Sequence, residues 1–180
     1  MPEGKTLATL DEGKLSVKLR RTLKQLLDGS FVERCENVVA FGLPGRGKTH
    51  YLSAVAHELV LRHQYRVYFT ATFKLVQQLL EAKANLQLEA MLKKLDRFDV
   101  IILDDLGYVK QTREEMEVLF TFFAERYERK SVMISSNRVF SEWDQIFHDP
   151  MTAMAAVDRL VHHSVLLEFG GGSYRAGGKK

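Results

Sequence analysis

Short runs of consecutive apolar residues alternate along this chain with longer stretches in which apolar residues recur every three or four positions. The first pattern is typical of buried strands, and the second is typical of amphipathic helices. The apolar runs predict strands at 37–41, 65–70, 100–103, 131–135 and 164–169. The periodic stretches predict helices at 14–27, 50–61, 72–84, 86–95, 113–127 and 152–162. This alternation predicts an α/β fold with a parallel sheet of five strands and helices on both faces.

A glycine-rich loop with a defined spacing joins the first predicted strand to its helix. Gly42-Leu43-Pro44-Gly45-Arg46-Gly47-Lys48-Thr49 fits the phosphate-binding loop pattern, which is Gly, four residues and Gly-Lys-Ser/Thr, at every fixed position. In such loops backbone N–H groups surround phosphate oxygens, and the helix N-terminus adds partial positive charge. Lys48 can reach the β and γ phosphates, and the Thr49 hydroxyl can hold Mg²⁺. The predicted binding residues for ATP with Mg²⁺ are Gly42, Pro44, Gly45, Arg46, Gly47, Lys48, Thr49 and His50.

Polar residues directly follow the third and fourth predicted strands. Asp104 and Asp105 follow one apolar run, and Asn137 follows the next. In a parallel sheet these ends face the same crevice as the glycine loop. We therefore expect Asp104 to hold Mg²⁺ with Thr49, and Asp105 to orient or deprotonate an attacking water. Asn137 would sit beside the γ-phosphate. Taken singly, these residues also fit two solvated loop acids and a turn asparagine.

Composition narrows the class of protein without naming a function. The 180 residues are 46% hydrophobic and 27% charged, which is ordinary for one globular domain with a sizeable core. No apolar run approaches the length of a transmembrane helix, and the first residues lack the apolar segment of a signal peptide. The single cysteine excludes an internal disulfide, and a reducing cytoplasm is the simplest location. The net charge of +3 is compatible with nucleic acid but not diagnostic of it.

With these motifs in order, the chain resembles the AAA+ ATPases, and more narrowly the IstB-type helper ATPases of insertion-sequence transposition, with DnaC-type helicase loaders as relatives. The resemblance runs from about residue 5 to residue 175. It is carried by Gly-Lys-Thr-His at 47–50, Leu-Asp-Asp-Leu-Gly-Tyr at 103–108, Ser-Ser-Asn-Arg at 135–138, Phe-Ser-Glu-Trp at 140–143, Asp-Pro at 149–150, Asp-Arg-Leu at 158–160, His162-His163 and Ser-Tyr-Arg at 173–175. It implies a three-layer α/β/α phosphate-loop core at 31–169, after a linker and helix at 1–30 and before a tail at 170–180.

The resemblance also assigns roles to individual residues. It implies that Asn137 is the first sensor, that Arg159 is an arginine finger reaching the nucleotide of a neighbouring subunit, and that Arg175 is a second sensor in its own subunit. A guanidinium supplied in trans would stabilise the charge spread over a transferring phosphoryl group, although a local ion pair is the simpler reading of Arg159 alone. The implied catalytic residues are Lys48, Asp105, Asn137 and Arg159, acting in a homo-oligomer.

Two stretches could contact DNA. The paired helices at 72–95 resemble the extra helix of initiators and loaders, and they carry Lys74, Lys83, Lys93 and Lys94. Such contacts would depend on salt and not on sequence, but a solvated helix face explains the lysines nearly as well. A second basic run, at 14–24, contains Lys14, Lys18, Arg20, Arg21 and Lys24 and no acid. This run could be a solvent-exposed basic face of a helix packed on the core, a DNA contact or a subunit contact.

Three departures from the family pattern leave the function open. Asp105 stands where many AAA+ enzymes have Glu, the small helical lid is expected to be absent or minimal, and the family's N-terminal domain is not recognisable. The leading expectation is an ATP-hydrolysing, DNA-assembled helper of a transposase. The alternatives are a loader of a replicative helicase, a nucleotide-binding module without turnover, and a small-molecule kinase.

Overall fold

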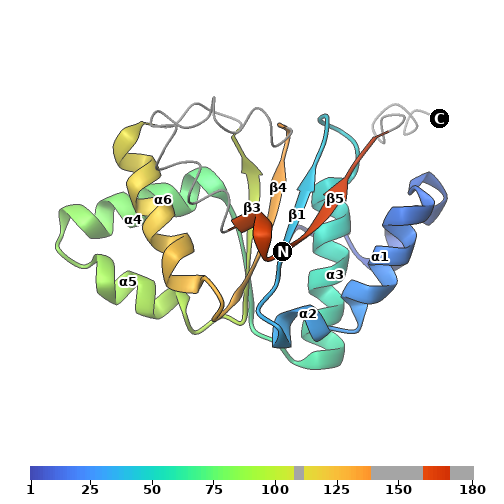
Figure 1. Ribbon diagram of the computed structural model, residues 1–180, viewed down its shortest axis with the longest axis horizontal. Helices are drawn as coiled ribbons and strands as arrows, with labels where there is room; N and C mark the ends of the chain where they lie inside the picture. The colour runs from blue at the N-terminus through green and yellow to red at the C-terminus, as the bar shows by residue number, and fades with distance from the viewer. Residues whose placement is uncertain (108–111, 139–159, 171–180) are drawn as a thin grey trace.

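The computed structural model describes residues 1–107, 112–138 and 160–170, and it confirms the predicted sheet (Figure 1). Five parallel strands lie in the order β2-β3-β4-β1-β5. Their bounds are β1 Asn37–Phe41, β2 Val67–Ala71, β3 Val100–Leu106, β4 Ser131–Ser136 and β5 Ser164–Glu168. The third strand is longer than its apolar run predicts, because it continues through the two acids to Leu106.

The helices match the periodic stretches to within two residues, except that the first begins later than predicted and that the short α2 was not predicted. Their bounds are α1 Val17–Leu27, α2 Ser30–Glu33, α3 Lys48–His63, α4 Thr72–Ala84, α5 Leu88–Leu95 and α6 Arg113–Arg126. The helix predicted from residue 14 begins only at Val17, because the Ser16 hydroxyl caps it by accepting from the Leu19 N–H at 3.2 Å. Before it lie two 3₁₀ turns, Leu7–Thr9 and Glu12–Lys14. Of the helix predicted at 152–162, residues 160–162 are helical and the rest lies outside the described residues.

Two apolar cores lie on the two faces of the sheet, as alternation along a strand requires. In β1, Val38 and Ala40 pack with α1, α2 and α3, whereas Val39 packs with the opposite core. Figure 1 shows α1, α2 and α3 on one side of the strands and α4, α5 and α6 on the other. The result is the predicted three-layer α/β/α arrangement. Among the helices in the described ranges, none combines the length and apolar composition needed to cross a bilayer.

Candidate nucleotide-binding site

The glycine loop lies at the carboxyl end of β1, and three of its glycines have positive φ angles. Gly45 and Gly47 have φ of 76° and 92°, and Gly47 directly precedes the first residue of α3. Gly42 has φ of 140°, and a Cβ at this position would lie 2.3 Å from the Phe169 carbonyl oxygen. Only glycine fits this close approach of the chain that follows β5. The loop is therefore shaped by its glycines for backbone N–H groups to face a ligand at the start of α3.

Lys48 is the group that joins the glycine loop to the end of β4. Its side chain is buried, with 4% of the residue exposed. Its Nζ donates to the carbonyl oxygens of Gly42 at 2.6 Å and Leu43 at 2.9 Å, and to Asn137 Oδ1 at 2.7 Å. The structure thus brings together two of the predicted catalytic residues, which are separated by 89 positions in the chain.

Thr49 and Asp104 meet between the start of α3 and β3. The Thr49 hydroxyl donates to Asp104 Oδ1 at 2.9 Å, and the same carboxylate oxygen accepts from the Ser135 hydroxyl at 2.5 Å. A hydroxyl and a carboxylate are oxygen ligands of the kind that Mg²⁺ prefers. The donor set therefore fits the predicted metal, and Thr49 and Asp104 stay its predicted ligands.

Asp105 lies in a β-bulge that sequence patterns did not reveal. Leu103 pairs with Ile134 and Leu106 pairs with Ser136, so two acids on β3 stand opposite the single residue Ser135 on β4. Asp105 takes a left-handed conformation, with φ of 60°. Its carboxylate lies within 3.5 Å of Asn137 Nδ2. The two consecutive acids of the bulge have different surroundings. Asp104 accepts a hydrogen bond from Thr49, and Asp105 lines a cavity beside the glycine loop.

A cavity of about 410 Å³ lies over these groups, at the carboxyl ends of the strands. It is lined by Lys5, Pro44, Gly45, Arg46, Gly47, Lys48, Thr49, His50, Asp105 and Asn137. His50 Nε2 also lies 3.1 Å from both Thr9 Oγ1 and the Thr6 carbonyl oxygen, which ties the N-terminal segment to the loop helix. Lys5 was not predicted, because a single lysine in an irregular segment carries no periodic or motif signal. We call Lys48, Thr49, Asp104, Asp105 and Asn137 the carboxyl-edge site.

Six other predicted residues are not placed at this site by the described part of the chain. Arg159 and Arg175 are outside the described residues, so their assignments stay predictions. The four candidate DNA-contacting lysines lie on α4 and α5, and none of them lines the cavity. Lys83 forms an ion pair with Glu117 at 3.0 Å, and Lys93 forms one with Glu89 at 2.6 Å.

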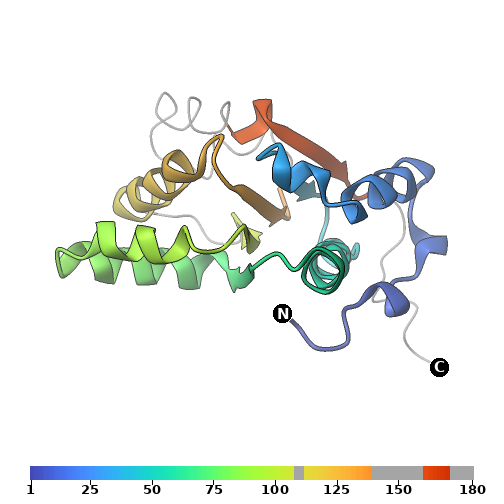
Figure 2. The ribbon, with the colours of Figure 1, turned by 90° about the horizontal axis from the view of Figure 1, so that it is seen from below.

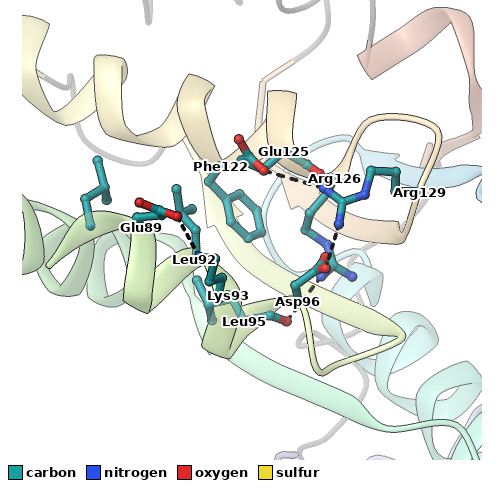
Figure 3. A pocket seen from close by; sticks show the side chains of 10 residues that line it. Glu89, Leu92, Lys93, Leu95, Asp96, Phe122, Glu125, Arg126 and Arg129 are labelled. Carbon is teal, nitrogen blue, oxygen red and sulfur yellow. Dashed lines mark hydrogen bonds and ion pairs between the residues drawn. The ribbon is translucent and has the colours of Figure 1, made fainter.

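A second cavity, of about 590 Å³, lies between α5 and α6 (Figure 3). Its lining includes Leu92, Leu95 and Phe122, and its charged side chains other than Arg126 form ion pairs with one another. Arg129 bonds Asp96 at 2.8 Å and approaches Glu125 at 3.5 Å. None of the phosphate-loop residues lines it. Its greater volume is therefore not a reason to place the nucleotide there.

The sheet order and the site define a phosphate-loop protein of the AAA+ class. Among solved structures, the fold is similar to that of the replication initiator DnaA bound to AMPPCP and single-stranded DNA, with a TM-score of 0.76 and 21% identity over 95% of this chain and 51% of that chain. It is also similar to DnaI, with a TM-score of 0.77 and 19% identity over 94% of this chain and 95% of that one. At these identities the likeness establishes the fold alone.

The chain belongs to the family of IstB-like ATP binding proteins, whose model matches residues 1–180. An insertion-sequence ATP-binding protein of Sinorhizobium fredii is 42% identical over 176 residues, which are 97% of this chain and 59% of the relative. The insertion sequence IS21 ATP-binding protein of Pseudomonas aeruginosa is 40% identical over 156 residues, covering 87% and 58%. The chain thus spans somewhat under two thirds of these relatives. The predicted family is confirmed.

Proposed function

We propose that this chain binds ATP with Mg²⁺ at the carboxyl-edge site and hydrolyses it when assembled on DNA, in support of a transposase. The observation that carries the proposal is the meeting of Lys48 Nζ with Asn137 Oδ1, next to the contact of Thr49 with Asp104. These two hydrogen bonds connect the carboxyl ends of β1, β3 and β4 beside one cavity. The names of the relatives, which are insertion-sequence ATP-binding proteins, support both the ligand and the transposition context.

Each residue of the site has a definite task in this proposal. Lys48 and the loop N–H groups bind the β and γ phosphates. Thr49 and Asp104 hold Mg²⁺, which when bound neutralises charge on these phosphates. Asp105 orients a water or accepts its proton, and Asn137 fixes the position of that water relative to the γ-phosphate.

A neighbouring subunit completes the site in this proposal. The support is the family resemblance at Arg159, whose guanidinium would stabilise the transferring phosphoryl group in trans. Arg175 would read the γ-phosphate within its own subunit. A homo-oligomer is the consequence, because a finger that reaches another subunit cannot act on its own nucleotide.

Loading of a replicative helicase is the second candidate, favoured by the fold likeness to the DnaC helicase loader, with a TM-score of 0.69 and 20% identity over 87% of this chain and 92% of that one. The insertion-sequence relatives are twice as similar in sequence, which favours transposition. A binding module without turnover is the third candidate, because Asp105 is one methylene shorter than the Glu of many AAA+ enzymes.

The deciding experiment measures ATP turnover per subunit against protein concentration, with and without duplex DNA. The proposal expects a rate that rises with concentration and rises further with DNA. Arg159→Ala should retain ATP binding and lose turnover. Zero turnover at every concentration, with ATP bound, would leave the binding module as the better description.

A further inference from the structure

Helix α1 carries four exposed basic residues and no acid. The four residues are Lys18, Arg20, Arg21 and Lys24. The whole chain has a formal net charge of +3, so the four cations of this helix more than account for the surplus. We call these four side chains the α1 cations. A positive potential of this density attracts polyanions over several ångströms.

The α1 cations have no acidic partner within the described residues, unlike several lysines and arginines elsewhere. Two acids near the ends of the helix, Asp11 and Asp28, are engaged with other groups. Asp11 pairs with Lys14 at 3.3 Å, and Asp28 accepts from the Ser30 N–H at 2.8 Å. Hydrogen bonding to Ser30, from its side chain first and from its backbone N–H second, lowers the pKa of Asp28. By contrast, Lys83 and Lys93 of α4 and α5 are already paired with glutamates.

The helix that carries the α1 cations is packed against the core of the protein. Leu19, Leu23 and Leu26 form the buried stripe of the helix, and they pack in the same core as α3. From α3, the buried Tyr51 hydroxyl donates to the Leu19 carbonyl oxygen at 2.9 Å. Figure 2 shows α1, in blue, at the opposite end of the molecule from α4 and α5, in green. The surface is therefore distinct from the helices that the sequence favoured for DNA contact.

We propose that the α1 cations bind the phosphate backbone of duplex DNA. A helix of eleven residues is about 16 Å long, which matches roughly five phosphates along one strand. A protein partner fits less well, because interface centres are apolar and poor in lysine, and Val17 is the one exposed large apolar side chain of α1. A lipid surface fits less well too, since the apolar stripe that would enter it is buried. Contacts to phosphates alone make the binding independent of sequence.

The inference rests on the DNA binding in the proposed function, and it is tested with two variants of equal charge change. The first is Lys18→Gln, Arg21→Gln and Lys24→Gln. The matched control is Arg34→Gln, Arg62→Gln and Arg129→Gln, which removes three cations that are already paired with acids. Fluorescence anisotropy with a labelled duplex is recorded over a range of KCl concentrations. Binding of a fluorescent ATP analogue and the unfolding midpoint establish that both variants are folded.

The α1 variant is expected to lose at least about tenfold in DNA affinity, with the slope of log K against log salt reduced by about 2 to 3. The control should stay within about threefold of the parent chain. Equal affinity of the α1 variant and the parent overturns the inference and leaves the proposed function intact. A parent chain that binds no duplex overturns both. Displacement of the duplex by polyglutamate at equal charge would identify an acidic polypeptide as the partner instead.

Ser135 is fully buried on β4, opposite the two acids of the bulge. Its hydroxyl accepts from the Asp105 N–H at 2.9 Å and donates to Asp104 Oδ1 at 2.5 Å. A bulge leaves a backbone N–H without its ladder partner, and here one side chain supplies that partner. The same oxygen therefore fixes the backbone of one acid and the carboxylate of the other.

We infer that Ser135 is a positioning residue for Mg²⁺, acting through Asp104. The variant Ser135→Ala is compared with Ser136→Ala, whose buried hydroxyl bonds the Leu106 carbonyl oxygen instead. Affinity for a fluorescent ATP analogue is measured while Mg²⁺ is titrated. Ser135→Ala should raise the Mg²⁺ concentration needed for half-maximal binding by about tenfold, with affinity without Mg²⁺ unchanged. Ser136→Ala should leave the Mg²⁺ midpoint in place.

An unchanged Mg²⁺ midpoint in Ser135→Ala overturns this inference, and so does an equal shift in Ser136→Ala, which would indicate general loosening of β4. Absence of Mg²⁺-dependent binding in the parent chain would instead contradict the proposed function. The readout is binding and not turnover, so the test holds for a chain that hydrolyses slowly.

Discussion

Charged side chains gather at both edges of the sheet, but they serve different purposes. At the amino edge, before β2, β3 and β4, lie Arg66, Asp99, Arg126 and Lys130, which we call the amino-edge cluster. Asp99 accepts from Lys130 Nζ at 2.8 Å and from the Arg66 N–H at 3.0 Å. At the carboxyl edge, by contrast, Lys48, Asp105 and Asn137 line a cavity beside the glycine loop.

Arg126 shows most clearly what the amino edge does. It is 3% exposed, and its guanidinium donates to four backbone carbonyls at 3.0 to 3.3 Å. These belong to Leu95, Phe98, Asp99 and Ser131. Burial lowers the pKa of Arg126 to about 10, which leaves it charged at neutral pH. Its bonds join the end of α5, the start of β3 and the start of β4. Charge at this edge therefore stabilises the scaffold, whereas charge at the other edge faces the cavity beside the glycine loop.

The largest expected effect is on ATP affinity, and it is tested by replacing one lysine at each edge of the sheet. Lys48→Ala should weaken ATP binding by at least about a hundredfold, because it removes the side-chain cation of the phosphate loop. Lys130→Ala should leave ATP affinity within about twofold, because Lys130 bonds Asp99 at the far edge. Calorimetric titration of both variants with ATP and Mg²⁺ makes the comparison. Equal losses in the two variants would mean that the edges are not functionally distinct.

The next effect is on stability. Arg126→Ala should lower the free energy of unfolding by roughly 2–4 kcal/mol, because it leaves several buried carbonyls without donors. Arg126→Lys, which keeps the charge but not the fork of donors, should lose less. Urea denaturation supplies the values, and ATP affinity of the folded fraction should match the parent. A stable Arg126→Ala chain with weakened ATP binding would reverse the roles assigned to the two edges.

Asp105→Asn tests the carboxyl edge at constant shape. Turnover should fall by about a hundredfold, since an amide cannot accept the proton of water. ATP affinity and unfolding free energy should change little, because the amide is nearly isosteric. Steady-state turnover and titration are measured on the same preparation. Turnover equal to that of the parent chain would remove Asp105 from the reaction.

The smallest expected effect is a pH dependence at the amino edge. Partial burial alone would raise the pKa of Asp99, but hydrogen bonds from Lys130 and the Arg66 backbone outweigh it and lower the pKa from 3.8 to about 2. Because the folded pKa lies below the unfolded one, this contribution to stability is present above about pH 4 and is lost as pH falls towards 2. The stability advantage of the parent over Asp99→Asn should therefore shrink over that range in urea titrations. A constant difference from about pH 5 to pH 2 would contradict it.

Sequence patterns predicted the sheet and the glycine loop because each depends on residues that are close together in the sequence. An apolar run predicts a buried strand, and Gly42 to Thr49 have the fixed spacing of a phosphate-binding loop. The order of the motifs also predicted that Asn137 would lie near the loop, and Lys48 Nζ does bond its amide oxygen. These features are local, or they follow from the rule that parallel strands end at one edge.

The bulge and the amino-edge cluster could not be predicted in the same way. Whether two residues of β3 stand opposite one residue of β4 depends on the pairing register, and no pattern within either strand encodes it. Ser135 was therefore noted in a motif without a role. Arg126 received no role from the sequence, because three of the four carbonyls that its guanidinium bonds lie 27 to 31 positions away in the chain. The periodicity of apolar residues does not predict side-chain hydrogen bonds between elements that are far apart in the sequence.

Hydrogen exchange with and without ATP and Mg²⁺ tests the distinction between the two edges most directly. Backbone amides at 42–49, 103–106 and 136–138 should become protected when the nucleotide is added, because the ligand binds among them. Amides at 95–100 and 126–131, which surround the amino-edge cluster, should exchange at the same rate in both states. Protection confined to the second group, or to the cavity between α5 and α6, would contradict the assignment of the nucleotide to the carboxyl edge.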